Sequence, residues 1–193
     1  MKICVFAASS DHLAPCFTEA AEELGRLLGQ GGHTLIFGGG RTGLMGACAR
    51  GAAEYGAEII GIAPRFFYEP GVLYERCSRF VWTETMAERK TAMEEAAEAF
   101  LVLPGGIGTM EEFFEVLTLR QLGLHAKPIA LLNTAGFYDG LAAFLQGMTE
   151  QGFAGREVPA LAALCGTPEE ALRALTDAPQ TQAQRRSKTE YFR

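Results

Sequence analysis

The sequence predicts an α/β domain whose mostly parallel sheet is covered by helices on both faces. Short apolar runs alternate with amphipathic stretches along the chain, and glycine clusters follow two of these runs. Near-continuous apolar runs are typical of strands buried on both faces, and a helix between strands is the usual crossover of a parallel sheet. We therefore expect a single Rossmann-like, doubly wound domain over residues 1–178, followed by a polar, basic tail at 179–193.

The first third of the chain predicts three strands separated by two helices. Apolar residues three and four positions apart mark one face of the first helix, and the pair Gly31-Gly32 ends it. The third strand is closed by Pro64. In chain order we expect a strand at 3–7, a helix at 16–28, a strand at 33–37, a helix at 43–55 and a strand at 58–63. The segment 65–78 mixes aromatic and charged residues with Pro70 and Gly71, which predicts a mobile loop over the site.

The remainder of the chain repeats the alternation. The helix expected after residue 85 is rich in Ala, Glu and Met, and the last helix begins with Thr167-Pro168-Glu169-Glu170, a capping-box pattern with proline in the first turn. The expected elements are a strand at 80–83, a helix at 86–98, a strand at 100–103, a helix at 110–122, a strand at 129–133, a helix at 137–151, a strand at 158–164 and a final helix from 168.

Composition excludes several classes of protein. The formal net charge of -6 does not suit binding of the whole molecule to nucleic acid. No secretion signal or membrane-spanning run is visible, and the five cysteines form no Cys-x-x-Cys pair, so we expect reduced thiols in a cytoplasmic protein. The three histidines lie far apart without metal-ligand spacing, so we expect no metal site.

The most informative segment is Pro104-Gly105-Gly106-Ile107-Gly108-Thr109, which follows an apolar run and precedes a helix. Glycines permit a sharp turn, and the free N–H groups at a helix N-terminus form an anion site. Glu111 and Glu112 stand beside it. A phosphate cradle with an adjacent carboxylate indicates an enzyme that acts on a phosphorylated small molecule.

A second glycine cluster, Gly38-Gly39-Gly40, follows the second expected strand. It lacks the lysine of a P-loop, which disfavours an NTPase, and taken alone it is equally well explained as a tight turn. Because ligands of parallel sheets bind beyond the carboxyl ends of the strands, both clusters fall where a ligand is expected.

Two charged segments have both a purely structural and a functional interpretation. Thr109-x-x-Glu112 fits a capping box, whereas the functional alternative has Glu112 facing a ribose and stabilising positive charge or activating water. Arg89-Lys90 fits a solvated basic pair, whereas the alternative directs the guanidinium at a phosphate or at the leaving base. Arg41 invites the same interpretation with less support.

Three motifs follow one another along the chain, namely Gly38-Gly39-Gly40-x-x-Gly43-Leu44-Met45-Gly46, Met86-x-x-Arg89-Lys90 and Pro104-Gly105-Gly106-x-Gly108-Thr109-x-x-Glu112. As a set they resemble the LOG ("Lonely guy") family of cytokinin riboside 5′-monophosphate phosphoribohydrolases, whose members often carry the label lysine decarboxylase. The similarity extends over residues 2–155 and departs from the family pattern at Ala7-Ala8, at Ala87 and at Ala97-Glu98.

The resemblance implies hydrolysis of the N-glycosidic bond of a plain or N6-modified adenosine monophosphate, without metal or organic cofactor, by a homodimer with its active site near the interface. It implies that Arg89 and Glu112 are the catalytic pair. It also implies a set of substrate-binding residues, namely Gly39, Gly40, Met86, Lys90, Gly105, Gly106, Gly108 and Thr109.

Three rival functions differ in what they require. A pyridoxal phosphate decarboxylase needs a Schiff-base lysine, and no partner acid for a pyridine nitrogen stands out near the four lysines. A carrier of a nucleotide or molybdenum cofactor would share the fold and the glycine clusters, but it has no use for Glu112 beside a phosphate. A general nucleoside monophosphate nucleosidase for salvage keeps the same chemistry with another biological role.

Overall fold

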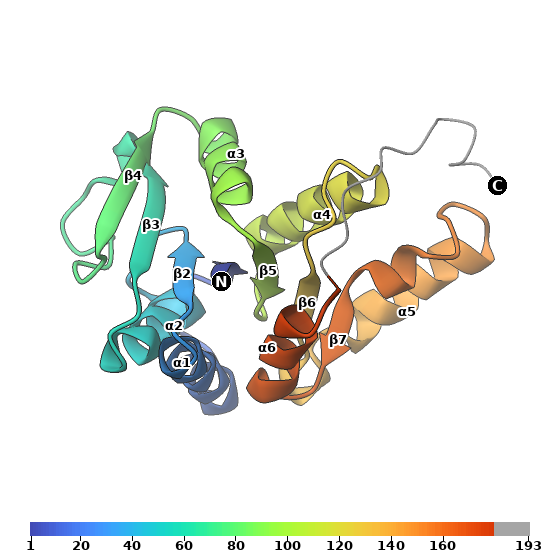
Figure 1. The fold of residues 1–193 in the computed structure, drawn as a ribbon, viewed down its shortest axis with the longest axis horizontal. Helices are drawn as coiled ribbons and strands as arrows, with labels where there is room; N and C mark the ends of the chain where they lie inside the picture. Colours follow the sequence, from blue (N-terminus) through green and yellow to red (C-terminus); the bar gives the residue numbers. More distant parts are fainter. Residues whose placement is uncertain (180–193) are drawn as a thin grey trace.

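The computed structural model describes residues 1–179, and its centre is a seven-stranded sheet in which all neighbouring strands are parallel (Figure 1). The strand order is β4-β3-β2-β1-β5-β6-β7, so the chain builds outward from β1 to one edge and then to the other. This is the doubly wound arrangement that the alternation predicts. The strands are β1 (Lys2–Phe6), β2 (Thr34–Phe37), β3 (Ile59–Pro64), β4 (Arg79–Thr83), β5 (Ala99–Val102), β6 (Ile129–Leu132) and β7 (Ala163–Cys165).

Helices cover both faces of the sheet, because successive side chains of each buried strand enter opposite cores. In β1, Ile3 and Val5 belong to the core beneath α1, α2 and α6, whereas Cys4 and Phe6 belong to the core beneath α3, α4 and α5. The helices are α1 (Pro15–Gln30), α2 (Gly43–Glu54), α3 (Met86–Ala96), α4 (Ile107–Gln121), α5 (Asp139–Glu150) and α6 (Pro168–Thr176).

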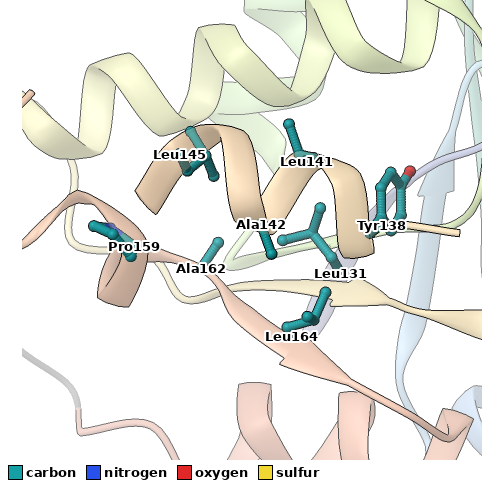
Figure 2. A pocket seen from close by; sticks show the side chains of 8 residues that line it. All are labelled: Leu131, Tyr138, Leu141, Ala142, Leu145, Pro159, Ala162 and Leu164. Carbon is teal, nitrogen blue, oxygen red and sulfur yellow. The ribbon is translucent and has the colours of Figure 1, made fainter. Parts of the chain in front are cut away.

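The second core contains an apolar cavity of about 60 Å³ between α5, β6 and β7 (Figure 2). Its one polar side chain is Tyr138, whose hydroxyl donates to the carbonyl of Leu103 at 2.6 Å. The lining offers no free acid, base or nucleophile, so this cavity is not where we look for chemistry.

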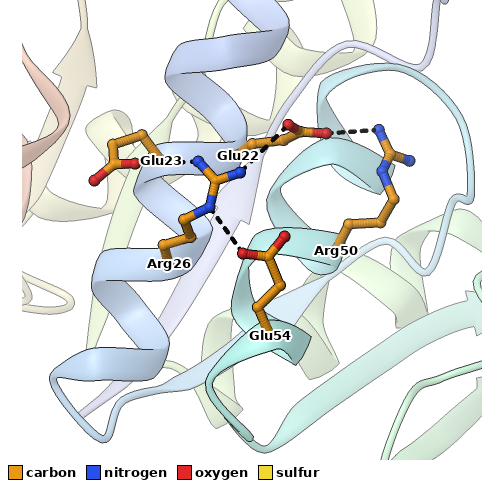
Figure 3. Close-up of polar contacts among 5 residues, drawn as sticks. All are labelled: Glu22, Glu23, Arg26, Arg50 and Glu54. Carbon is orange, nitrogen blue, oxygen red and sulfur yellow. Dashed lines mark hydrogen bonds and ion pairs between the residues drawn. The ribbon is translucent and has the colours of Figure 1, made fainter.

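In the first core, α1 and α2 approach so closely that glycine is required between them. A Cβ on Gly25 or on Gly51 would collide with backbone of the other helix. Ion pairs span the solvent side of the same contact (Figure 3). Arg26 contacts Glu22, Glu23 and Glu54, and Arg50 contacts Glu22. Such exposed pairs contribute little individually, typically below about 1 kcal/mol.

Several predicted boundaries need correction. The strand expected at 158–164 is only Ala163–Cys165, because Pro159 starts a 3-10 turn at Val158–Leu161. The helix expected at 110–122 begins three residues earlier, at Ile107. At the last helix the prediction is confirmed, since Thr167 Oγ1 accepts from the N–H of Glu170 at 3.2 Å.

The segment 65–78 contains regular backbone contacts. It begins with a 3-10 turn at Arg65–Phe67 and then pairs with the turn after β2. The N–H of Arg41 donates to the carbonyl of Val72 at 3.0 Å, and the N–H of Tyr74 donates to the carbonyl of Gly39 at 2.9 Å. This segment is therefore fastened to the first glycine cluster.

Candidate active site

A buried ion pair joins α3 to α4 at the carboxyl end of the sheet. The guanidinium of Arg89 lies 3.1 Å from the carboxylate of Glu112, and the two residues are only 8% and 9% exposed. Arg89 Nε also donates to the carbonyl of Ile62 on β3 at 3.2 Å. The interpretation of Arg89 as a solvated surface charge is therefore wrong.

The start of α3 is fixed by a capping box that our sequence analysis missed. Thr85 Oγ1 accepts from the N–H of Glu88 at 3.1 Å, and the Glu88 carboxylate accepts from the N–H of Glu84 at 2.9 Å. The Thr-x-x-Glu spacing before a helix was a visible signal. It sets the beginning of the helix that carries Arg89.

At α4, by contrast, the capping interpretation of Thr109 and Glu112 is wrong. The N-cap is Gly106, and no side chain caps the helix. Thr109 and Glu112 lie within the helix, three residues apart, and both are buried on one face. Burial raises the pKa of Glu112, and Arg89 opposes that rise. A buried carboxylate held by an arginine is typical of a functional site.

The N-terminus of α4 is open. The structure gives the N–H groups of Ile107, Gly108 and Thr109 no acceptor among residues 1–179. A Cβ placed on Gly106 or Gly108 would meet nothing within 4 Å. Unsatisfied N–H groups and the helix dipole together favour an anion here.

Gly105 serves a different purpose in the same turn. Its missing side chain leaves room for Thr109, whose Oγ1, Cβ and Cγ2 are the nearest atoms. The side chain of Thr109 is thereby packed under the turn, and the turn stays close to the helix that follows. Gly106 and Gly108, by contrast, remain accessible.

The N-terminus of α2 looks similar in sequence, but the protein itself fills it. The N–H of Gly43 donates to the carboxylate of Asp11 at 2.7 Å. The N–H groups of Leu44 and Met45 donate to the carbonyl of Ala8 at 2.9 and 3.3 Å. Asp11 was not singled out in the sequence, although its place just after β1 put it at the correct edge of the sheet.

The first glycine cluster makes room for side chains. A Cβ on Gly38 would collide with the guanidinium of Arg89. On Gly39, whose φ is 79°, a Cβ would lie 2.7 Å from the ring of Phe80, and on Gly40 it would lie 2.7 Å from the methyl of Met45. Gly38 thus places this turn directly against the catalytic candidate Arg89.

Two exposed apolar residues mark the helix ends at the site. Met86, the first residue of α3, is 40% exposed, and Ile107, the first residue of α4, is 88% exposed. Both side chains are therefore accessible to a ligand at this edge of the sheet.

Lys90 does not face open solvent as a free cation. Its ammonium group forms ion pairs with Glu111 and with Glu115, the latter at 2.8 Å, and its side chain is 17% exposed. The hydrogen bond with Glu111, followed by that with Glu115, raises the pKa of Lys90. The interpretation of Lys90 as a solvated charge is therefore wrong as well.

Among residues 1–179, no group of three His, Cys, Asp or Glu side chains could hold a metal ion. In the same part of the chain, no helix has the length and apolar character needed to cross a membrane. The five cysteines are free thiols, and Cys4, Cys48 and Cys165 are buried.

Comparison with known proteins matches residues 45–175 to the family described as "Possible lysine decarboxylase". Two cytokinin riboside 5′-monophosphate phosphoribohydrolases of Arabidopsis thaliana are similar in sequence. LOG2 is 39% identical over 152 residues, covering 79% of this chain and 71% of the relative. LOG7 is 38% identical over 152 residues, covering 79% and 70%.

Among solved structures, the molybdenum cofactor carrier protein of Chlamydomonas reinhardtii is similar in fold. The TM-score is 0.70 at 22% identity, and the match covers 91% of this chain and 96% of the carrier. At that identity the similarity establishes the fold and leaves the chemistry to the residues of the site.

Proposed function

The chain belongs to the LOG family, and from this premise we propose that it hydrolyses the N-glycosidic bond of adenosine 5′-monophosphate or an N6-modified form of it. The products are the free base, adenine or a cytokinin, and ribose 5-phosphate. The observation that carries the proposal is the buried Arg89–Glu112 pair beside the uncapped N-terminus of α4.

We place the substrate by its charges. The phosphate binds the free N–H groups at the N-terminus of α4, where Gly105, Gly106, Gly108 and Thr109 shape the cradle. Glu112, one helical turn further along α4, then lies toward the sugar. The base extends toward Gly39 and Gly40, in the glycine turn after β2, and toward Met86. Phosphate binding supplies remote binding energy that holds the ribose at the carboxylate.

The reaction forms a bond between a water oxygen and C1′ and breaks the bond between C1′ and N9. The bonding electrons leave with the base, which ends protonated by the proton that the water loses. Positive charge develops on the ribose during this exchange, and the Glu112 carboxylate stabilises it and orients the water. Arg89 fixes that carboxylate and favours its ionised form, which burial alone disfavours.

Lysine decarboxylation, the activity in the family's description, fits the site poorly. Lys90 is paired with two carboxylates, and Lys127 donates from its ammonium group to the carbonyl of Glu94. Lys2 is exposed at the start of β1, at the opposite end of the strand from the glycine turns. The remaining lysine, Lys188, lies outside the described residues. Of the described lysines, Lys90 lies nearest to the cradle by its contact with Glu111, and it is already paired there.

We further propose a cytoplasmic homodimer that needs neither a metal nor an organic cofactor and binds neither nucleic acid nor a membrane. The dimer follows from the resemblance to the family, and the free cysteines support a reducing compartment. Sedimentation of the purified protein tests the dimer, with a species of twice the chain mass of 20.8 kDa expected.

The function is tested by incubating the protein with adenosine monophosphate and with N6-isopentenyladenosine monophosphate and following base release by chromatography. We expect release of base and ribose 5-phosphate from at least one substrate, and loss of at least about a hundredfold in kcat for Glu112→Gln. Binding without release by the wild type would instead favour a carrier. Full activity in Glu112→Gln would contradict the assignment of the carboxylate.

Stability needs a parallel check in Glu112→Gln. Removing one partner of a buried ion pair typically costs about 3–5 kcal/mol, because the other charge is left buried. Gln retains an oxygen that can accept from Arg89, so we expect a smaller loss. A melting curve at the assay temperature shows whether the variant is still folded.

A further inference from the structure

We infer that Lys90 is a positioning residue that clamps α3 to α4 and thereby fixes Glu112 against Arg89. This inference rests on the proposed function and assigns Lys90 a role other than binding the substrate phosphate. It arises from three ion pairs that two adjacent residues of α3 make with a single turn of α4.

Lys90 holds α4 at two points, and we call this pair of contacts the grip. Lys90 contacts Glu111 and Glu115, which lie one helical turn apart on α4. The neighbouring Arg89 contacts Glu112, which lies between them. A rotation or a slide of α4 that moves Glu112 away from Arg89 would therefore also strain both ion pairs of Lys90.

Burial makes this grip different from an ordinary surface ion pair. The side chain of Lys90 is largely covered, and Glu115 Oε2, which lies 2.8 Å from the Lys90 ammonium group, is buried from solvent. Without the lysine this buried oxygen would lose its cationic contact, although the Glu115 side chain as a whole is 37% exposed. Repulsion between the acidic side chains of α3 and α4 would then favour separation of the two helices.

The other charges around Lys90 strengthen the need for it. Glu94 projects from α3 into the same cluster, where Lys90, Glu94, Glu112 and Glu115 line a space too small for a water molecule. Arg89 neutralises one of the acids. Lys90 contacts Glu115, and both Lys90 and Lys127 act on Glu94, so removing Lys90 would increase the repulsion between Glu94 and Glu115.

The same contacts argue against a phosphate ligand. Two carboxylates already take two of the three N–H donors of the ammonium group and offset its charge, so only one donor is left for a phosphate. If Lys90 were nonetheless a ligand, neutralising Glu111 and Glu115 would release it and tighten nucleotide binding. If Lys90 is a clamp, the same neutralisation would loosen α4 and slow catalysis. The two roles therefore predict opposite effects.

The test compares Lys90→Met, the double variant Glu111→Gln with Glu115→Gln, and the triple variant that combines them. For each we measure kcat and KM for base release and the affinity for adenosine monophosphate by calorimetry. We expect Lys90→Met and the double variant each to lower kcat by about tenfold or more, because small misplacement of a catalytic group is expensive. The affinity should stay within about twofold, and the triple variant should be no slower than Lys90→Met, since both changes remove one interaction.

Two further variants separate positioning from general destabilisation. Lys90→Arg keeps a cation that reaches both carboxylates and should restore most of kcat. Arg26→Met removes one ion pair between α1 and α2, with Glu54, and two within α1, with Glu22 and Glu23 (Figure 3), and it should lower the melting temperature slightly without lowering kcat.

A weakened affinity in Lys90→Met with unchanged kcat, together with a tightened affinity in the double variant, would overturn the clamp. So would equal loss of kcat in Arg26→Met. If the wild type binds adenosine monophosphate but releases no base, the proposed function fails. The affinity series then still decides whether Lys90 is a phosphate ligand.

Discussion

The two glycine-rich turns on either side of β1 differ in what occupies the helix N-terminus that follows each. At α2 the carboxylate of Asp11 and the carbonyl of Ala8 accept from the first N–H groups. At α4 the equivalent groups have no acceptor within the described chain. A glycine cluster before a helix is therefore an anion site only where the protein leaves the N–H groups free.

The glycines themselves differ in the same way. Gly38 and Gly39 make room for Arg89 and Phe80, so their function is to let side chains approach the backbone. Gly106 and Gly108 have open space where a Cβ would be. The first turn is a packing device that supports Arg89, and the second is a surface that can receive a ligand.

The largest effect expected from this difference concerns Gly43 and Gly106. Gly43 has a φ of 60°, and its Cβ would lie 2.5 Å from the carbonyl oxygen of Ala8. We expect Gly43→Ala to lower the free energy of unfolding by about 3 kcal/mol, combining left-handed strain with steric overlap. Chemical denaturation measures it, with Gly106→Ala as the control that should unfold like the wild type. Equal stability of the two variants would contradict the contrast.

A smaller effect is expected at Asp11. Asp11→Ala removes the acceptor for the Gly43 N–H and should cost about 1 kcal/mol of stability, the usual loss for a helix cap. KM for the nucleotide should not rise, because the substrate phosphate binds the other turn. A large rise in KM with intact folding would move the phosphate site to α2.

The smallest effect expected is on the pH dependence of stability, and it concerns Glu94, an acidic residue of α3 that faces the acids of α4. Burial, followed by repulsion from Glu115, raises the pKa of Glu94 to about 7. A raised carboxyl pKa means that the folded state holds the proton more tightly, so stability falls as pH rises from the ordinary glutamate range to about 7. Glu94→Gln should therefore be more stable than the wild type at pH 8, by about 0.5 kcal/mol once solvent screening is allowed for.

Denaturation at pH 4.5 and pH 8 measures this effect. The advantage of Glu94→Gln over the wild type should be greater at the higher pH. An advantage that is the same at both values would show that Glu94 ionises normally in the folded protein.

The order of strands and helices was predictable because each local pattern agrees with the global fold. Buried runs such as 100–103 have no polar face, and that alone places them within a covered parallel sheet. The short β7 was not predictable to the residue, since Pro159 lies inside an apolar run that otherwise resembles a strand. There tertiary context decides between a strand and a 3-10 turn.

The residues of the site were predictable as candidates, but their contacts were not. The Thr109-x-x-Glu112 spacing also fits a capping box. The structure decides against it because α4 begins at Ile107, which places Thr109 inside the helix, and because Glu112 pairs with Arg89. Asp11 carries no motif of its own, because its role depends on α2 ending up beside the loop after β1. Lys90 was recognised as part of a motif, yet its two partners come from another helix.

The most direct test of the open cradle is to give α4 the kind of cap that α2 already has. Gly106 has an extended backbone with φ of -87°, so aspartate fits there and its carboxylate can accept from the free N–H groups. We would measure the affinity for adenosine monophosphate and the melting temperature of Gly106→Asp beside Gly106→Ala. We predict that Gly106→Asp melts no lower than Gly106→Ala and binds the nucleotide at least about tenfold more weakly. Unchanged affinity in Gly106→Asp would show that the phosphate does not bind at the N-terminus of α4.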